Sequence, residues 1–224
     1  NKKLLILDLD DTLWGGIVGD VGWKNLRIGG HDHLGEAFRD LQIQIKSLKN
    51  QGIILALASK NEETVAIEAI NKHPEMVLSM NDFVTYRINW EDKAKNIVDI
   101  VNELNLGLQS VVFLDDSPFE RARVRDMLPE VLVPELPKDP TDYNTFLSKL
   151  RCFDKAHITK EDKIRSNLYK SETKRTKLKQ QKKSLSGWIK TLNLTIIIEK
   201  IKDENTPRAT QLLNKTNQMN LSTR

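Results

Sequence analysis

The chain has one cysteine among its 224 residues, which excludes a disulfide within the chain. Such sparing use of cysteine is typical of proteins that fold in a reducing compartment. No apolar run approaches the ~18 residues that a membrane-spanning helix needs, and the first residues do not resemble a signal peptide. We therefore expect a cytoplasmic protein. Because the sequence opens directly before an apolar run and ends without a closing element, we also expect a piece of a longer polypeptide.

Aromatic residues are scarce at 6%, and they are not interleaved with the basic residues as a surface for stacking nucleic-acid bases would need. The net charge of +4 is unevenly distributed. Residues 1–150 hold 17 Lys/Arg and 24 Asp/Glu, a net charge of −7, whereas residues 151–224 hold 18 and 7, a net charge of +11. Seven of these cations fall between Lys170 and Lys183. This basic run is either a solvated helix face or a docking surface for an acidic partner.

The stretch from Lys3 to Thr12 organises the rest of the chain. Its apolar residues 4–7 predict a buried strand, and three acids follow within four positions. Because side chains alternate along a strand, Asp8 and Asp10 point the same way. Two buried carboxylates on one side need a cation, and Mg²⁺ prefers such oxygen ligands.

Strands alternate with helices in residues 1–150, which predicts a parallel sheet covered on both faces, a three-layer α/β fold. The predicted strands are residues 4–7, 53–58, 83–88, 110–114 and 131–133. The predicted helices are residues 34–50, 61–72, 91–105 and 118–127. The glycine-rich residues 15–22 predict a loop or a short flap hairpin, and residues 23–28 a small strand.

Three prolines between residues 134 and 140 mark a boundary, so we expect a catalytic core at 1–150 and a basic, mainly helical segment with one strand at 151–224. The helices expected near and beyond the boundary are residues 142–150, 160–190 and 206–216, and the strand is residues 195–198.

Polar residues follow three of the predicted strands where each one ends. In parallel sheets, ligands bind beyond these carboxyl ends. The residues concerned are Asp8 and Asp10, then Ser59, Lys60 and Asn61, and finally Asp115 and Asp116. This arrangement predicts a phosphoryl-transfer site around one divalent cation.

Each of these residue types suggests a role. We expect Asp8 to be the nucleophile and a metal ligand, and Asp10 to be the acid/base and a metal ligand through its carbonyl. Asp115 would complete the metal site, and Asp116 would either cap a helix or bind the metal. The phosphoryl oxygens would be held by Ser59, Lys60, Asn61 and Lys93, with Lys95 in reserve.

These signals match, in order, the motifs of the haloacid dehalogenase-like (HAD) superfamily: DxDxT, a Ser after the second strand, a Lys, and DD. The resemblance implies a Rossmannoid core that uses Mg²⁺. Only 46 residues separate Thr12 from Ser59, and one helix and a short strand lie between Ser59 and Lys93. Neither gap holds a large cap domain, so we expect an open site that admits a bulky or protein-borne substrate.

A closer resemblance is to the FkbH-like branch. It rests on residues 8–22, 88–93, 113–121 and 214–223, with Asp92 where proline is expected. The resemblance implies a glyceryl transferase/phosphatase of polyketide biosynthesis, within a larger multidomain synthase. Its substrate would be D-1,3-bisphosphoglycerate. It would remove phosphate and load a three-carbon unit onto the phosphopantetheine thiol of an acidic acyl carrier protein.

Acyl transfer suggests an enzyme thiol, and Cys152 is the only one, with His157 as its base. The alternative is that Cys152 is a small buried residue, since direct transfer to the carrier thiol needs no enzyme cysteine. His31 and His33 resemble a metal pair but are better explained as surface residues. Two other functions remain open: a plain phosphatase of a small molecule or phosphoprotein, and a catalytically silent carrier-docking module.

Overall fold

The computed structural model describes residues 2–154, 165, 167–173, 175, 195, 197–198 and 200–215, the last five by their backbone only. The chain divides into two compact units, Asn1–Lys177 and Leu178–Arg224. The boundary predicted at residue 150 from composition stays a prediction.

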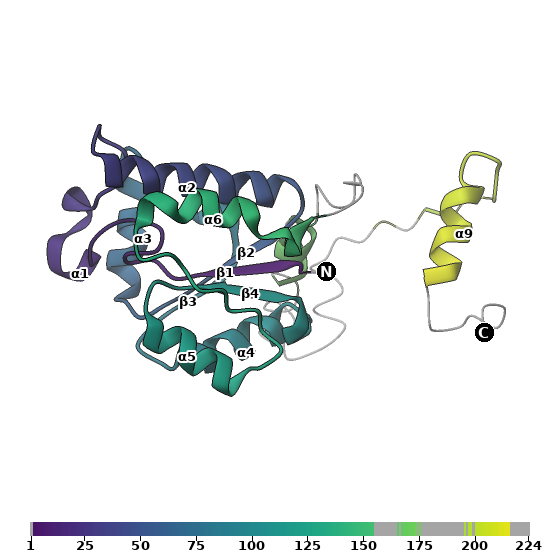
Figure 1. The fold of residues 1–224 in the computed structure, drawn as a ribbon. Helices are drawn as coiled ribbons and strands as arrows, with labels where there is room; N and C mark the ends of the chain where they lie inside the picture. The colour runs from purple at the N-terminus through teal and green to yellow at the C-terminus, as the bar shows by residue number, and fades with distance from the viewer. Residues whose placement is uncertain are drawn as a thin grey trace. The chain divides into compact units, whose positions relative to one another are not determined.

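The first unit is built on a four-stranded parallel sheet, as predicted (Figure 1). The strand order is β3-β2-β1-β4. The strands are β1 (Leu4–Leu7), β2 (Ile54–Ser59), β3 (Phe83–Ile88) and β4 (Val111–Leu114). Every residue of β1, β2 and β4 is buried, which explains why these strands are read from the sequence as apolar runs without alternation.

Helices cover both faces of this sheet (Figure 1). Alternate residues of each strand point to opposite faces, so Leu5 and Leu7 join one apolar core while Leu4 and Ile6 join the other. The first core is completed by α2 (His33–Asn50), α3 (Glu63–Lys72) and α6 (Tyr143–Lys149). The second is completed by α4 (Lys93–Glu103) and α5 (Pro118–Met127).

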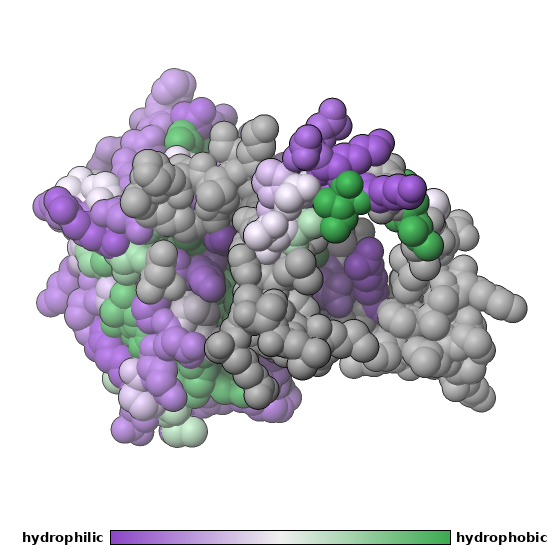
Figure 2. Space-filling view, turned by 90° about the vertical axis from the view of Figure 1, so that its right-hand side faces the viewer, coloured by the Kyte–Doolittle hydropathy of each residue, from purple (hydrophilic) through white to green (hydrophobic). Residues whose placement is uncertain are grey.

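Short turns of helix connect these elements. In the first half of the chain they are α1 (Val18–Val21), η1 (Trp23–Asn25) and η2 (Met80–Asp82). Later in the chain they are η3 (Leu108–Ser110), η4 (Pro140–Asp142) and η5 (Arg151–Phe153). Hydrophilic side chains cover much of the described surface on the face drawn in Figure 2, with apolar ones showing between them.

Three sequence-based assignments are wrong in detail. The glycine-rich flap holds the short helix α1 instead of a hairpin, and residues 23–28 contain η1 and a single bridge between Gly15 and Arg27. Residues 131–133 make only one bridge, from Leu132 to Val112. Pro134 follows directly, and a proline cannot donate the next backbone hydrogen bond of a strand.

The C-terminal assignments have mixed outcomes. Helix α9 (Thr206–Lys215) agrees with the prediction. Residues 165, 167–173 and 175 are helical, and the rest of the helix expected at 160–190 lies outside the described residues. Within residues 195–198, those that the structure describes are not in a strand, and Ile197 and Ile198 are 76% and 92% exposed. An apolar run without a partner strand has no ladder to join. Within the described residues, no helix is long and apolar enough to cross a membrane.

Candidate active site

Strand register brings the predicted acids to one edge of the sheet. Leu7, the last residue of β1, pairs with Leu57 on one side and Leu114 on the other. Asp8 and Asp115 therefore follow equivalent positions on neighbouring strands, and the Asp8 amide donates to the Leu114 carbonyl over 3.0 Å. Both side chains are buried. The sequence prediction that these strand ends meet is confirmed.

Lys93 lies between the two acids. It is the first residue of α4, whose N-terminus is capped by the Asp92 side chain through the amides of Ala94 and Lys95. Its Nζ lies 2.6 Å from Asp115 Oδ2 and 3.0 Å from Asp8 Oδ2. Burial alone would lower the pKa of Lys93, but the two carboxylates raise it to about 12, so the ammonium stays charged.

Asp8, Asp115 and Asp116 form an acidic cluster whose charge a single lysine does not neutralise. Burial, followed by the charge of Asp8, raises the pKa of Asp115 despite the contact with Lys93. Burial and Asp8 likewise raise the pKa of Asp116. Oxygens of these three carboxylates lie within 4.8 Å of one another. Asp8 Oδ1 is buried and has no hydrogen-bond partner, which is costly for a carboxylate oxygen. A hard divalent cation would satisfy that oxygen and the excess charge, so the residues present fit Mg²⁺.

Asp116 belongs to this acidic cluster and does not cap α5. Ser117 is the N-cap, since its hydroxyl accepts from the Glu120 amide. The Asp116 amide donates to Thr12 Oγ1 over 3.0 Å, and this hydroxyl donates back to Asp116 Oδ1 over 3.2 Å. The buried Thr12 thus orients Asp116. Of the two roles considered from sequence, the geometry favours the one toward a metal.

Asp10 faces the flap. Its Oδ1 accepts from the Trp14 indole over 2.8 Å and from the Val18 amide over 3.0 Å, while its Oδ2 accepts from Asn61 Nδ2 over 2.8 Å. Burial raises the pKa of Asp10 above its ordinary value, and these three donors oppose that rise. A carboxyl with a raised pKa, two residues from Asp8, suits a proton donor.

Of the residues at the end of β2, Ser59 and Asn61 lie in the site, whereas Lys60 points to its edge. Ser59 and Asn61 are buried, and Asn61 bonds Asp10. The Lys60 ammonium instead forms an ion pair of 2.6 Å with Glu120 in the first turn of α5. Its predicted contact with a phosphoryl group stays a prediction, and the structure gives Lys60 a different partner.

Cys152 lies far from the acidic cluster. Its carbonyl accepts from the Lys2 amide at the amino end of β1, whereas Asp8 follows the carboxyl end. Six residues of extended chain separate Lys2 from Asp8, or about 20 Å. Burial raises the pKa of the Cys152 thiol, which disfavours the reactive thiolate. The structure therefore gives no support to a catalytic Cys152, and its proposed base His157 lies outside the described residues.

Two further features were not anticipated. The buried Gln42 of α2 donates to the Leu13 carbonyl over 2.8 Å and accepts from the amides of Val77 and Leu78, so it ties the root of the flap to a neighbouring loop. Arg121 of α5 donates to the backbone of Asp115 and Asp116. Neither has a sequence signal of its own, since a lone glutamine or arginine in an amphipathic helix reads as a surface residue.

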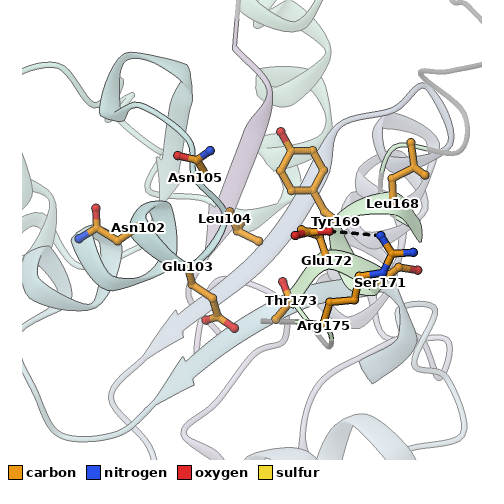
Figure 3. A pocket seen from close by; sticks show the side chains of 10 residues that line it. All are labelled: Asn102, Glu103, Leu104, Asn105, Leu168, Tyr169, Ser171, Glu172, Thr173 and Arg175. Atoms are coloured by element: carbon orange, nitrogen blue, oxygen red, sulfur yellow. Dashed lines mark ion pairs between the residues drawn. The ribbon is translucent and has the colours of Figure 1, made fainter. Parts of the chain in front are cut away.

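A cavity of about 740 Å³ lies elsewhere in the first unit (Figure 3). It is lined by residues 102–105 and by residues 168, 169, 171–173 and 175, among which Arg175 pairs with Glu172. Residues 102–105 lie at the far end of α4 from Lys93, about 16 Å away along an 11-residue helix. This cavity is therefore separate from the acidic cluster.

Comparison with known proteins gives a structural neighbour of high sequence identity. No family model and no curated protein matches the chain. The N-terminal part of the protein BF1531 from Bacteroides fragilis, a crystal structure that contains a phosphatase domain complexed with Mg, is 52% identical and superposes with a TM-score of 0.68. The match covers 70% of this chain and 42% of that one, so this chain spans less than half of that neighbour.

Two weaker matches are also found. The HAD domain of effector protein Lem4 (inactive mutant) from Legionella pneumophila has 14% identity and a TM-score of 0.49, covering 68% of this chain and 95% of that one. The 3-deoxy-D-manno-octulosonate 8-phosphate phosphatase from Moraxella catarrhalis has 14% identity and a TM-score of 0.38, covering 86% and 94%. The parallel sheet, its two helical layers and the likeness to the Bacteroides protein show that this chain has the α/β, HAD-like Rossmannoid fold of phosphatase domains.

Proposed function

We propose that this chain is a Mg²⁺-dependent HAD-type phosphatase whose nucleophile is Asp8. One observation carries the proposal: Asp8 Oδ1 is buried and unpartnered, next to Asp115, Asp116 and the charged Lys93. A carboxylate paired with a lysine, with one oxygen unused, is suited to attack phosphorus. The likeness to a phosphatase domain complexed with Mg supports the same activity.

The chain's own residues divide the reaction between them. In the first step an oxygen of Asp8 attacks the phosphorus, and the bond from phosphorus to the leaving oxygen breaks in line with it. Lys93 balances negative charge at the reacting group. Asp10 gives its proton to the leaving oxygen, and in the second step it takes a proton from the water that cleaves the aspartyl phosphate.

Mg²⁺ would be held by Asp8 and Asp115, with Asp116 as a further ligand. The Asp10 carbonyl is the remaining predicted ligand. When bound, the ion neutralises the phosphoryl oxygens and the excess charge of the carboxylates. Ser59 and Asn61, buried at the end of β2, are the groups we assign to the phosphoryl oxygens.

For the substrate, we keep the function that the FkbH-like resemblance implies. The thiol of an acyl carrier protein would attack the acyl carbon of D-1,3-bisphosphoglycerate, so that a C–S bond forms, the C–O bond to phosphate breaks, and the thiol proton leaves with the phosphate. Asp8 would then hydrolyse the remaining phosphomonoester. Because Cys152 lies at the other end of β1, direct transfer to the carrier thiol is the better route.

The acidic carrier protein and the larger multidomain synthase also stay proposals. The basic segment beyond residue 150 supports an acidic partner by its charge alone, and much of it lies outside the described residues. The expected cytoplasmic location, drawn from cysteine usage, likewise remains a prediction.

Two measurements test these proposals separately. Release of phosphate from an aryl phosphate should require Mg²⁺ and should be lost in Asp8→Asn but kept in Asp20→Asn, which alters an exposed acid of α1. Incubation with bisphosphoglycerate and a phosphopantetheinylated carrier, followed by intact mass measurement, should show the carrier gaining a glyceryl unit. Phosphate release without a mass gain favours the plain phosphatase. An Asp8→Asn variant with intact turnover removes the nucleophile assignment, and no turnover with any substrate favours a silent docking module.

A further inference from the structure

Arg121 is a buried arginine that the proposed reaction does not use. It lies in the first turns of α5, and its side chain is 6% exposed. One of its guanidinium nitrogens, Nη1, donates to the carbonyl of Asp115 over 2.8 Å and to the carbonyl of Asp116 over 2.6 Å. A single side chain thus holds the backbone of two adjacent members of the acidic cluster.

The other side of the same guanidinium is anchored. Nε and Nη2 of Arg121 donate to one oxygen of Glu135, over 3.1 and 2.8 Å. Glu135 lies on the segment that follows the bridge of residue 132 and is itself 64% exposed. The planar guanidinium is therefore fixed from two directions, and only an arginine offers donors in that geometry.

Fixing these carbonyls also fixes the directions of the carboxylates. Asp115 and Asp116 leave β4 just before α5 begins, so no strand ladder holds their carbonyls. The side chains are restrained separately, since Asp115 Oδ1 accepts from the Ser117 amide and Asp116 bonds Thr12. With backbone and side chains both held, the oxygens converge within 4.8 Å of one another and of Asp8.

We propose that Arg121 is a positioning residue for the divalent-cation site, acting through the carbonyls of Asp115 and Asp116. The inference rests on the proposed function, because it assumes that these carboxylates bind Mg²⁺. Groups that orient metal ligands typically contribute 10–100-fold to metal affinity. Arg121 also places a permanent positive charge behind the acidic cluster, which lessens the repulsion between its carboxylates.

The chain contains a matched control. Arg125 lies one helical turn further along α5 and pairs with the same Glu135, but its other contacts are to the Val133 carbonyl. Replacing Arg125 disturbs the same helix and the same glutamate without touching the acidic cluster.

The experiment measures Mg²⁺ binding by calorimetry on the full chain, alongside turnover and thermal stability. For Arg121→Lys we expect the Mg²⁺ Kd to rise by about 10-fold or more, with kcat recovering at saturating Mg²⁺. For Arg125→Lys, Kd should stay within about 2-fold of the wild-type value. Wild-type Mg²⁺ affinity in a folded Arg121→Lys overturns the inference.

If Arg121→Lys does not fold, Glu135→Gln decides, because it leaves Arg121 in place and removes the carboxylate that Arg121 and Arg125 both contact. A Kd increase beyond that of Arg125→Lys supports the inference, and an equal or smaller one overturns it. The binding measurement is independent of catalysis. A wild-type chain that binds Mg²⁺ but hydrolyses no phosphate defeats the proposed function and leaves the positioning role standing.

Discussion

Lys93 and Asp115, 22 residues apart in the chain, form a buried ion pair with 2.6 Å between Nζ and Oδ2. The lysine begins α4, the aspartate follows β4, and the same Nζ reaches Asp8 after β1. Three elements therefore meet at one ammonium group. Because both partners are almost fully buried, neither charge is compensated by water if the other is removed.

Replacing Lys93 tests this dependence. We expect Lys93→Met to unfold more easily by about 3–5 kcal/mol when no divalent cation is present, because two carboxylates are left buried and unpaired. Urea denaturation measures the change. Lys95→Met is the control, since its pair with Glu91 is exposed and should contribute little to stability. Equal effects of the two substitutions would contradict the central role of the buried pair.

Divalent cations should stabilise the fold through the acidic cluster. Ligand at 100 times its Kd adds about 2.7 kcal/mol to the free energy of unfolding, so Mg²⁺ should raise the Tm of the wild-type chain and EDTA should reverse the rise. Asp115→Asn removes one carboxylate of the cluster and should lose most of this shift. Asp126→Asn, on the exposed side of α5, should keep it. A full shift in Asp115→Asn would place the cation elsewhere.

The indole of Trp14 should influence the pKa of Asp10. The hydrogen bond from Trp14 lowers the pKa of Asp10 against the larger effect of burial, so Trp14→Phe should raise that pKa further. The protonated carboxyl, which we propose as the proton donor to the leaving oxygen, then persists to higher pH, and the basic limb of the profile of kcat/KM should move upward. Trp23→Phe, which alters a tryptophan outside the site, should leave the profile in place. A profile unchanged in Trp14→Phe would remove Asp10 as the acid.

Asp82, which lies outside the active site, should make the stability of the fold depend on pH. Burial tends to raise the pKa of Asp82, but bonds from Lys49 and Ser79 outweigh it and hold the pKa below its ordinary value. A depressed folded-state pKa means that the pair stabilises the fold above the unfolded-state pKa of about 4. The contribution is lost as the pH falls through the lower, folded-state pKa. Asp82→Asn should therefore be less stable than wild type at pH 7, and the difference should be smaller at about pH 3. An equal difference at both values would rule out this linkage.

The strand ends and the residues on them were predictable because their signals are local. A buried apolar run that stops at acids fixes where each strand ends, and parallel pairing brings those ends together. The sequence therefore predicts that Asp8 and Asp115 lie together, and it assigns Lys93 to the same site by its motif. The contacts of Arg121 with the Asp115 and Asp116 carbonyls cannot be predicted in this way, because every residue has a backbone carbonyl and no residue type reveals which one is contacted.

Two of the wrong assignments have a common physical cause. Apolar runs at residues 131–133 and 195–198 read as strands, but a strand exists only where a neighbour offers a ladder. Pro134 limits the first run to one bridge, and the described residues of the second are exposed. Pairing is a property of the whole fold and cannot be read from one segment.

The hydrogen bond from the Val18 amide to Asp10 Oδ1 couples the protonation of Asp10 to the position of α1. A protonated carboxyl is a weaker acceptor than a carboxylate, so α1 is held less firmly whenever Asp10 carries its proton. By thermodynamic reciprocity, any contact that strengthens the hydrogen bond from α1 also lowers the pKa of Asp10. A substrate that contacts α1 would thereby lower the pKa of Asp10. In the proposed mechanism, this favours transfer of the Asp10 proton to the leaving oxygen of that substrate.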